Sequence, residues 1–170
     1  NLFARTLGGF FGDKLGKSKG LRGRVLFLAG ILIVEGIMLT IFSIQTSFLV
    51  AIVFLILFSL TVQMSEGATF SVVPFINKKA IGSVSGIVGA GGNVGAFLAA
   101  LLLKSKSAVA EKAAIAVNQG LGEGALNTAQ ATASSAAVSQ SYLLIGFIVV
   151  ATGIVALSIR FSTEDEKVTD

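Results

Sequence analysis

Four long apolar runs dominate the pattern of hydrophobic and polar positions along the chain. Polar residues interrupt these runs only sparsely, and the runs cover residues 25–44, 48–76, 83–103 and 142–161. A helix needs about 20 apolar residues to cross the ~30 Å hydrocarbon core of a bilayer, and each run meets this length. The pattern therefore predicts four transmembrane helices. The surplus length of the second run indicates a tilt, or a kink near Pro74.

The remaining segments are short, basic or rich in small residues. Residues 1–12 are mostly apolar, so we expect them to be the end of a further helix. The sequence begins with Asn rather than Met, so we expect it to be part of a longer protein. Residues 13–24 are expected to form a cytoplasmic basic loop, and residues 162–170 a cytoplasmic tail. Residues 104–141 are mostly Ala, Ser, Gly, Gln and Thr. Their composition favours a flexible extracellular loop with one short helix at 109–117.

The distribution of basic residues predicts the orientation in the membrane. The loop at 13–24 holds five Lys and Arg residues, the link at 77–79 holds Lys78 and Lys79, and the tail holds Lys167. Four spans place these three segments on one side, which the positive-inside rule assigns to the cytoplasm. The 104–141 segment on the other side has a lower density of basic residues.

Composition narrows the class of protein further. The chain of 170 residues is 54% hydrophobic and 13% charged, whereas soluble domains average ~25% charged residues. An all-α, polytopic membrane protein therefore fits better than a soluble or disordered one. The chain has no Cys and no His, which argues against a disulfide scaffold, a zinc site or a serine-protease triad. We expect no enzyme activity, metal or cofactor. The net charge of +4 arises from the basic loop, so it does not indicate nucleic-acid binding.

Three polar side chains are expected at similar depth inside the membrane. Arg5 precedes the start of the basic loop by eight residues, which at 1.5 Å per residue places it ~12 Å into the bilayer. The same estimate places Asn93 and Glu66 at ~15 Å, close to the midplane. Charged groups at this depth are costly and usually functional. Their shared depth on three helices predicts a binding site at the midplane.

The glycine-rich third run contributes a second feature of this site. On a helical wheel, Gly86, Gly89 and Asn93 fall on one side, so that backbone and an amide donor face the same direction. Gly91 and Gly95 fall on the opposite side, where they allow a neighbouring helix to pack closely.

Each of these residues also has a purely structural interpretation. The glycines could serve helix packing alone, and Asn93 could form an interhelical hydrogen bond without binding a ligand. Glu66 could pair with a basic residue or carry a proton. Glu35 is assigned a structural role, because its sequence neighbours show no polar face. A lone Arg5 near the midplane is the hardest to explain without an anion or a carboxylate partner.

The sequence from Gly8 to Gly16 resembles the loop motif of the major facilitator superfamily, Gly-x-x-x-Asp-Arg/Lys-x-Gly. Gly9, Asp13, Lys14 and Gly16 occupy its defined positions. The motif has a second copy between the eighth and ninth helices, and here it is followed by four spans. The resemblance therefore implies the C-terminal helix bundle of a twelve-helix transporter, from the end of helix 8 through helix 12. It also implies that Asp13 and basic residues of the loop form a cytoplasmic gate.

Two further stretches resemble the nitrate/nitrite porter family. The first is Asn1-Leu2-Phe3-Ala4-Arg5-Thr6-Leu7-Gly8-Gly9, and the second is Ser85-Gly86-Ile87-Val88-Gly89-Ala90-Gly91-Gly92-Asn93-Val94-Gly95-Ala96. The first is similar to the family's eighth helix, whose Arg holds the substrate anion. The second is similar to the family's Gly-rich signature in the eleventh helix. The segment from Glu66 to Phe75 is similar to the tenth helix. The resemblance is good over residues 1–103, and the 104–141 segment departs from it.

The resemblance implies a proton-coupled nitrate transporter that works by alternating access in the plasma membrane. Arg5, Gly86, Gly89 and Asn93 would bind nitrate or nitrite, and Glu66 is the candidate for proton coupling. The partners are then the anion, protons, the lipid bilayer and the N-terminal half of the same transporter, which this sequence lacks. Two alternatives stay open: a major facilitator transporter of another small anion or solute, and a membrane helix bundle that does not transport.

Overall fold

The computed structural model describes residues 2–118, 120, 122–159 and 161, and this part of the chain contains four long helices and no strand. The helices are α1 (Leu2–Ser43), α2 (Phe48–Ile76), α3 (Ile81–Val117) and α4 (Glu123–Leu157). All four are long and apolar enough to cross a membrane. The prediction of an all-α chain with four membrane-spanning helices is confirmed. The predicted tail at 162–170 lies outside the described residues, as do residue 1 of the first predicted segment, residues 119 and 121 of the predicted 104–141 loop and residue 160 of the predicted 142–161 span.

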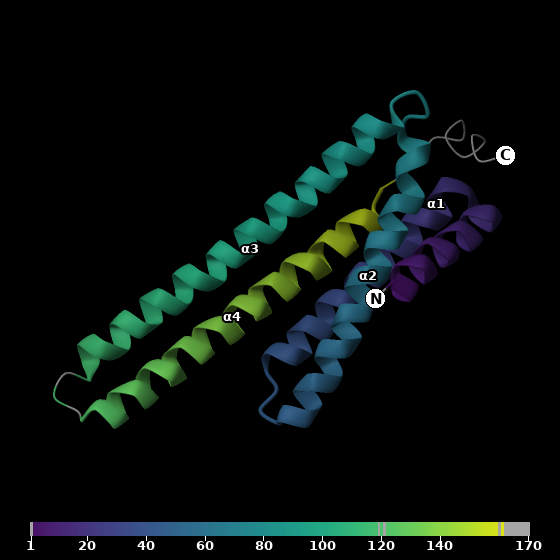
Figure 1. Cartoon of the computed structure of the whole chain (residues 1–170). Helices are drawn as coiled ribbons and strands as arrows, with labels where there is room; N and C mark the ends of the chain where they lie inside the picture. The colour runs from purple at the N-terminus through teal and green to yellow at the C-terminus, as the bar shows by residue number, and fades with distance from the viewer. Residues whose placement is uncertain (1, 119, 121, 160, 162–170) are drawn as a thin grey trace.

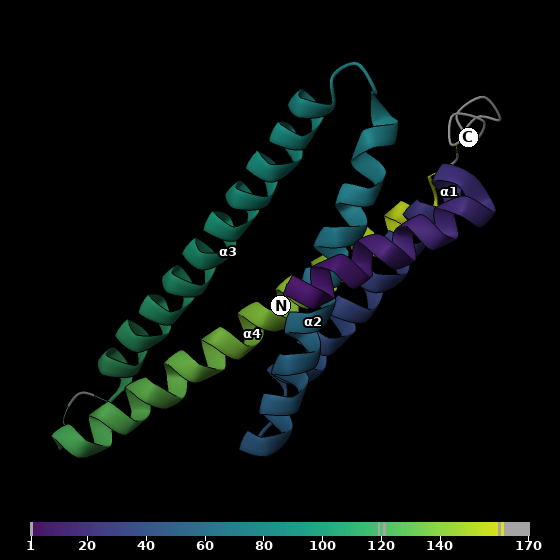
Figure 2. The ribbon, with the colours of Figure 1, turned by 45° about the vertical axis from the view of Figure 1, so that its right-hand side comes forward.

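Helix α1 folds back on itself in the middle of the expected basic loop. Lys19 and Gly20 leave helical geometry, and Gly20 has a φ of 62° and a ψ of −152°. Glycine adopts a positive φ without the steric cost that a Cβ would bring, so it permits this reversal. The first arm of α1 (residues 2–18) and the second arm (residues 21–43) consequently lie side by side (Figure 2). Residues 13–24 were expected as a loop, but they are helical except at this break.

The 104–141 segment is also helical rather than a flexible loop. Residues 104–117 continue α3, residues 123–141 begin α4, and the turn between the two helices is short. The segment is rich in Ala, the strongest helix former, and contains no Pro, so its low hydrophobicity did not indicate disorder. The two helices form a long hairpin, and the end of α3 and the start of α4 lie away from α1 and α2 (Figure 1). Its extramembrane location remains a prediction.

Helices α1, α2 and α4 pack closely where glycines replace larger side chains. A Cβ on Gly67 of α2 would collide with the backbone carbonyl of Arg5, and one on Gly8 of α1 would collide with the carbonyl of Met64. On the other side of α1, a Cβ on Gly36 would lie 2.6 Å from the carbonyl oxygen of Gly146 in α4. These close approaches bring the backbones of α2 and α4 onto α1, as small residues do at membrane helix interfaces.

Helix α3 is packed far less tightly than the others. Among its described residues, Ala114 is buried, and the rest are partly or fully exposed. Large apolar side chains on α3 are exposed, including Ile87, Phe97, Leu98 and Leu101. Beyond the turn at residues 77–80, α3 diverges from α2 and approaches α4 at its far end (Figures 1 and 2).

Candidate functional site

Arg5 and Glu66 form an ion pair between the first arm of α1 and α2. Arg5 Nη2 lies 3.0 Å from Glu66 Oε1, and the two side chains are 46% and 42% exposed. The Arg5 guanidinium also lies over the Phe70 ring, 5.3 Å from its centroid. The backbones of α1 and α2 cross closely at Gly67, where any side chain would separate the two helices. This close crossing places Arg5 opposite Glu66. Arg5 therefore has a carboxylate partner, one of the two explanations that the sequence left open for it.

A cavity of about 410 Å³ opens beside this pair, between α2 and α3. Its lining comes from Val62, Ser65, Glu66, Thr69 and Phe70 on α2 and from Val88, Gly89, Gly92 and Asn93 on α3. Glu66 and Phe70 thus contact both the cavity and Arg5. The structure brings Glu66, Gly89 and Asn93 together at this cavity, and Arg5 lies outside the lining but pairs with Glu66.

The glycine side of this cavity leaves space next to the polar groups. A Cβ added to Gly89 or Gly92 would meet no atom within 4 Å. Gly86, the other predicted glycine, is exposed and lies outside the cavity lining, one turn closer to the start of α3. Gly91 and Gly95 are exposed with nothing within 4 Å, so no described helix packs on them.

The charges and donors of the site are suited to an anion rather than a metal ion. Arg5 offers guanidinium N–H donors and Asn93 offers amide donors. Within the described residues, no group of three Cys, His, Asp or Glu side chains is placed to hold a metal. Glu66 neutralises Arg5 in this structure, so an anion that binds Arg5 has to compete with the Glu66 carboxylate.

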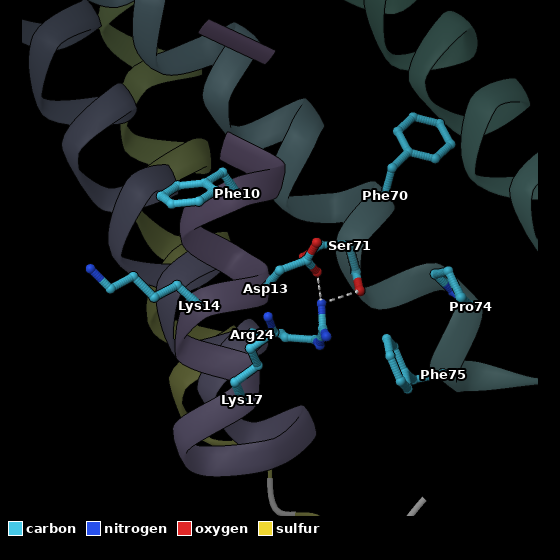
Figure 3. A pocket seen from close by; sticks show the side chains of 9 residues that line it. All are labelled: Phe10, Asp13, Lys14, Lys17, Arg24, Phe70, Ser71, Pro74 and Phe75. Atoms are coloured by element: carbon cyan, nitrogen blue, oxygen red, sulfur yellow. Dashed lines mark hydrogen bonds and ion pairs between the residues drawn. The ribbon is translucent and has the colours of Figure 1, made fainter. Parts of the chain in front are cut away.

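The loop motif forms a second polar cluster, at the end of the first arm of α1. Asp13 pairs with Arg24 of the second arm, across the break in α1 (Figure 3). Arg24 Nη1 donates to the carbonyl oxygen of Ser71 in α2 at 3.2 Å, and its guanidinium stacks on Phe75 at 4.3 Å. One arginine therefore connects both arms of α1 to the end of α2.

The other motif residues surround this cluster. A Cβ at Gly16 would lie 2.5 Å from Arg24 Nε, so Gly16 makes room for the arginine side chain. Lys14 and Asp13 line a cavity of about 770 Å³ between α1 and α2. Gly9 lies against α2, where a Cβ would be 3.8 Å from the carbonyl oxygen of Gly67.

Sequence reasoning missed two residues that the structure makes prominent. Arg24 was counted among the basic residues of the loop, for topology and for the gate, and was not singled out, although its side chain is just 10% exposed. Glu35 was assigned a structural role, and the structure buries it, with its Oε2 atom lacking a hydrogen-bond partner among the described residues. Neither environment could be read from spacing, because each depends on how α1 packs against its neighbours.

Comparison with known proteins identifies several relatives. The chain is 41% identical over 102 residues to high affinity nitrate transporter 2.5 of Arabidopsis thaliana, a match that covers 60% of this chain and 20% of that protein. It is 41% identical over 97 residues to nitrate transporter 2.2 of Chlamydomonas reinhardtii, a match that covers 56% of this chain and 19% of that protein. It is 33% identical over 109 residues to the nitrate/nitrite transporter NrtP of Picosynechococcus sp., a match that covers 63% of this chain and 20% of that protein.

The remaining comparisons add no further relative. No family model matches the chain, and no solved structure is similar to it. The relatives are named as transporters, which agrees with the expectation of a protein that is not an enzyme. The chain spans about a fifth of the length of these curated relatives. Over the matched region the chain is similar to proteins named as nitrate or nitrate/nitrite transporters, and its four helices are long and apolar enough to cross a membrane.

Proposed function

We propose that this chain is the C-terminal part of a proton-coupled nitrate transporter that also accepts nitrite and acts in the plasma membrane. The observation that carries the proposal is the Arg5–Glu66 pair beside a cavity walled by Gly89 and Asn93. A membrane helix bundle without a transport role would explain the packing glycines. It would give no reason for a half-exposed ion pair facing a cavity.

The donor groups suit a small planar oxyanion. A guanidinium presents N–H donors in a flat fork that matches two oxygens of nitrate at once. Asn93 supplies an amide donor, and the bare backbone at Gly89 keeps that side of the cavity free of side chains. The N-terminal half of the transporter would close the site from the opposite side, and the two halves would rock about the bound anion.

Glu66 gives a physical route from proton to anion. While it is ionised, Glu66 occupies the donors of Arg5 at 3.0 Å. A proton on Glu66 removes that competition and leaves Arg5 with an unpaired positive charge, which favours nitrate. Binding of the proton and of the anion then reinforce each other, as coupled transport requires.

The Asp13–Arg24 cluster would act as the cytoplasmic gate. It connects two arms of α1 and the end of α2 through a single side chain, so a rocking motion that separates these elements has to break it. The cluster would stabilise one of the two access states and set the rate at which the halves exchange.

The test is the nitrate-evoked current of the full-length protein in voltage-clamped oocytes at acid external pH. An inward current in the wild type is expected. It should be lost in Arg5→Ala and retained in Arg22→Ala, which removes an exposed arginine of the second arm. A wild-type current that Arg5→Ala leaves intact would move the anion site elsewhere. No response to nitrate, nitrite or other small anions would favour an organic solute or a bundle that does not transport.

A further inference from the structure

A cavity with an excess of positive charge lies beside the gate cluster, at the end of the first arm of α1. Its volume is about 770 Å³, and three cationic side chains and one carboxylate contribute to its lining. These charged residues are Lys14, Lys17, Arg24 and Asp13. The carboxylate offsets one of the three cations, so two positive charges are left over. The proposed anion site at the Arg5–Glu66 pair uses neither of them.

The two lysines of this cavity have no carboxylate partner in the described chain. Lys14 and Lys17 are three residues apart on a helix, so they are neighbours on one face of the first arm. Both residues are exposed, and neither belongs to an ion pair of the described residues. The cavity lining therefore includes two ammonium groups without a counter-charge.

Arg24 brings a buried guanidinium to the same cavity. Its side chain is 10% exposed and lies between the first arm of α1 and the end of α2 (Figure 3). Both of its hydrogen bonds start from Nη1, one to Asp13 and one to the carbonyl oxygen of Ser71. Its Nε atom is buried and has no hydrogen-bond partner among the described residues. A guanidinium carries five N–H donors, so Arg24 has donor capacity that Asp13 and Ser71 do not use.

The rest of the lining is mostly apolar and aromatic. It includes Phe10 of the first arm and Phe70, Pro74 and Phe75 of α2. A cavity of this volume has room for an organic group as well as for an ion. A phosphate monoester carries about two negative charges at neutral pH and has three strong acceptor oxygens. The excess positive charge therefore suits the phosphate, and the apolar walls suit the organic group attached to it.

We propose that this cavity binds a phosphate monoester, with Lys14, Lys17 and Arg24 on the phosphate oxygens and the organic group against the phenylalanines. The phosphate has two possible sources, an anionic phospholipid or a soluble phosphate ester. The cavity lies at the helix ends that the positive-inside rule assigns to the cytoplasm, where anionic lipids are concentrated. A bound phosphate repels the Asp13 carboxylate and competes with it for Arg24, so the ligand opposes the Asp13–Arg24 pair. The inference goes beyond the proposed transport of nitrate and does not depend on it.

The experiment measures binding to the purified full-length protein in detergent by thermophoresis. The lipid probe is dioctanoyl phosphatidic acid, the soluble probe is glycerol 3-phosphate, and dioctanoyl phosphatidylcholine controls for the acyl chains. The wild type should bind phosphatidic acid saturably and more tightly than phosphatidylcholine. Lys17→Gln should weaken this binding about fivefold, whereas Asp13→Asn should strengthen it because it removes the repelling carboxylate. Arg22→Gln, which removes the same charge from an exposed residue outside the lining, is the matched control and should keep the wild-type affinity.

The outcomes separate a built site from general attraction to basic residues. Equal weakening by Lys17→Gln and Arg22→Gln would overturn the inference, as would a lack of saturable binding of both phosphate probes. Lys17→Arg keeps the charge and should keep the affinity, which distinguishes a lost contact from a folding defect. If the site holds, glycerol 3-phosphate that binds as tightly as phosphatidic acid identifies a soluble ester as the source. A clear preference for phosphatidic acid identifies the lipid.

Discussion

Two groups of glycines in this molecule differ in what surrounds them. Gly8, Gly36 and Gly67 lie at the crossings of α1 with α2 and α4, where an added Cβ would strike backbone atoms of the neighbouring helix. The glycines of α3, including Gly86, Gly89 and Gly91, have nothing within 4 Å of such a Cβ. The first group lets backbones meet, whereas the second group leaves space.

The contrast teaches how to interpret glycine-rich membrane helices. Both groups fit the same sequence pattern of small residues at helical spacing, so the pattern alone does not separate packing from ligand contact. The structure separates them by the presence or absence of a facing backbone. Gly89 and Gly92 are open and also line a cavity with Glu66 and Asn93, which makes them candidates for substrate contact.

Substitution at the α1–α2 crossing should have the largest effect. Gly67→Val places a branched side chain against the carbonyl of Arg5, and overpacking of this kind costs about 1–3 kcal/mol or more. We expect little folded protein at the cell surface, as measured by surface labelling and by size-exclusion chromatography in detergent. Gly91→Val on α3 is the control with open surroundings. Equal surface levels for the two variants would break the comparison between the glycine groups.

The gate cluster should have the next largest effect. Arg24→Ala removes the Asp13 pair, the hydrogen bond to Ser71 and the Phe75 contact in one step. One hydrogen bond to a charged group contributes about 1.5–3 kcal/mol, so a shift of about tenfold to a hundredfold in the gating equilibrium is expected. The maximal rate of nitrate uptake per surface transporter should fall, and Arg22→Ala should not lower it.

Asp13→Asn provides a milder test of the same cluster. The Asp13 side chain is 57% exposed, which weakens its ion pair through solvent screening. We expect a several-fold loss of turnover with little change in the nitrate concentration that gives half-maximal uptake. An unchanged maximal rate would contradict the gating role.

A side chain on the open glycine wall should change affinity rather than folding. Gly89→Val would project into the cavity beside Glu66 and Asn93 without meeting the protein. Nitrate should then need a higher concentration for half-maximal uptake, while the surface level stays near that of the wild type. If Gly89→Val reduces surface expression as strongly as Gly67→Val, the glycine wall serves packing in the assembled transporter.

Gly86→Ala should have the smallest effect of the series. Gly86 is exposed, lies outside the cavity lining and has open space around it. Alanine favours a helix over glycine by about 1 kcal/mol, so stability should be unchanged or slightly higher. Uptake kinetics within about twofold of the wild type are expected. A strong loss of affinity would return Gly86 to the binding site, where the sequence alone had placed it.

The sequence was informative about the spans and about which polar residues lie near one another. Runs of apolar residues identified the four membrane-spanning helices because bilayer thickness fixes their length. Counting residues from the ends of the runs predicted one level for Arg5, Glu66 and Asn93. In the structure Glu66 and Asn93 line one cavity from α2 and α3, and Arg5 pairs with Glu66. A helix rises by a constant amount per residue, which makes such counting reliable.

The sequence was less informative wherever helical character came from small or basic residues. The 104–141 segment is polar enough for a loop and rich enough in Ala for a helix, and the structure makes most of it helical. The helical extent of α1 through Asp13 was missed for a related reason, because basic residues are good helix formers. The contacts of Arg24 and the burial of Glu35 depend on how the helices pack against one another, and a one-dimensional pattern does not contain that packing.

The most direct test of the central claim is nitrate binding to the purified full-length protein, measured by calorimetry for Arg5→Ala, Glu66→Gln and the double variant. If Glu66 competes with nitrate for Arg5, Glu66→Gln binds nitrate more tightly than the wild type at neutral pH. Arg5→Ala should bind weakly, and adding Glu66→Gln to it should bring no gain. Tighter binding from Glu66→Gln in the absence of Arg5, or wild-type binding by Arg5→Ala, would contradict the account.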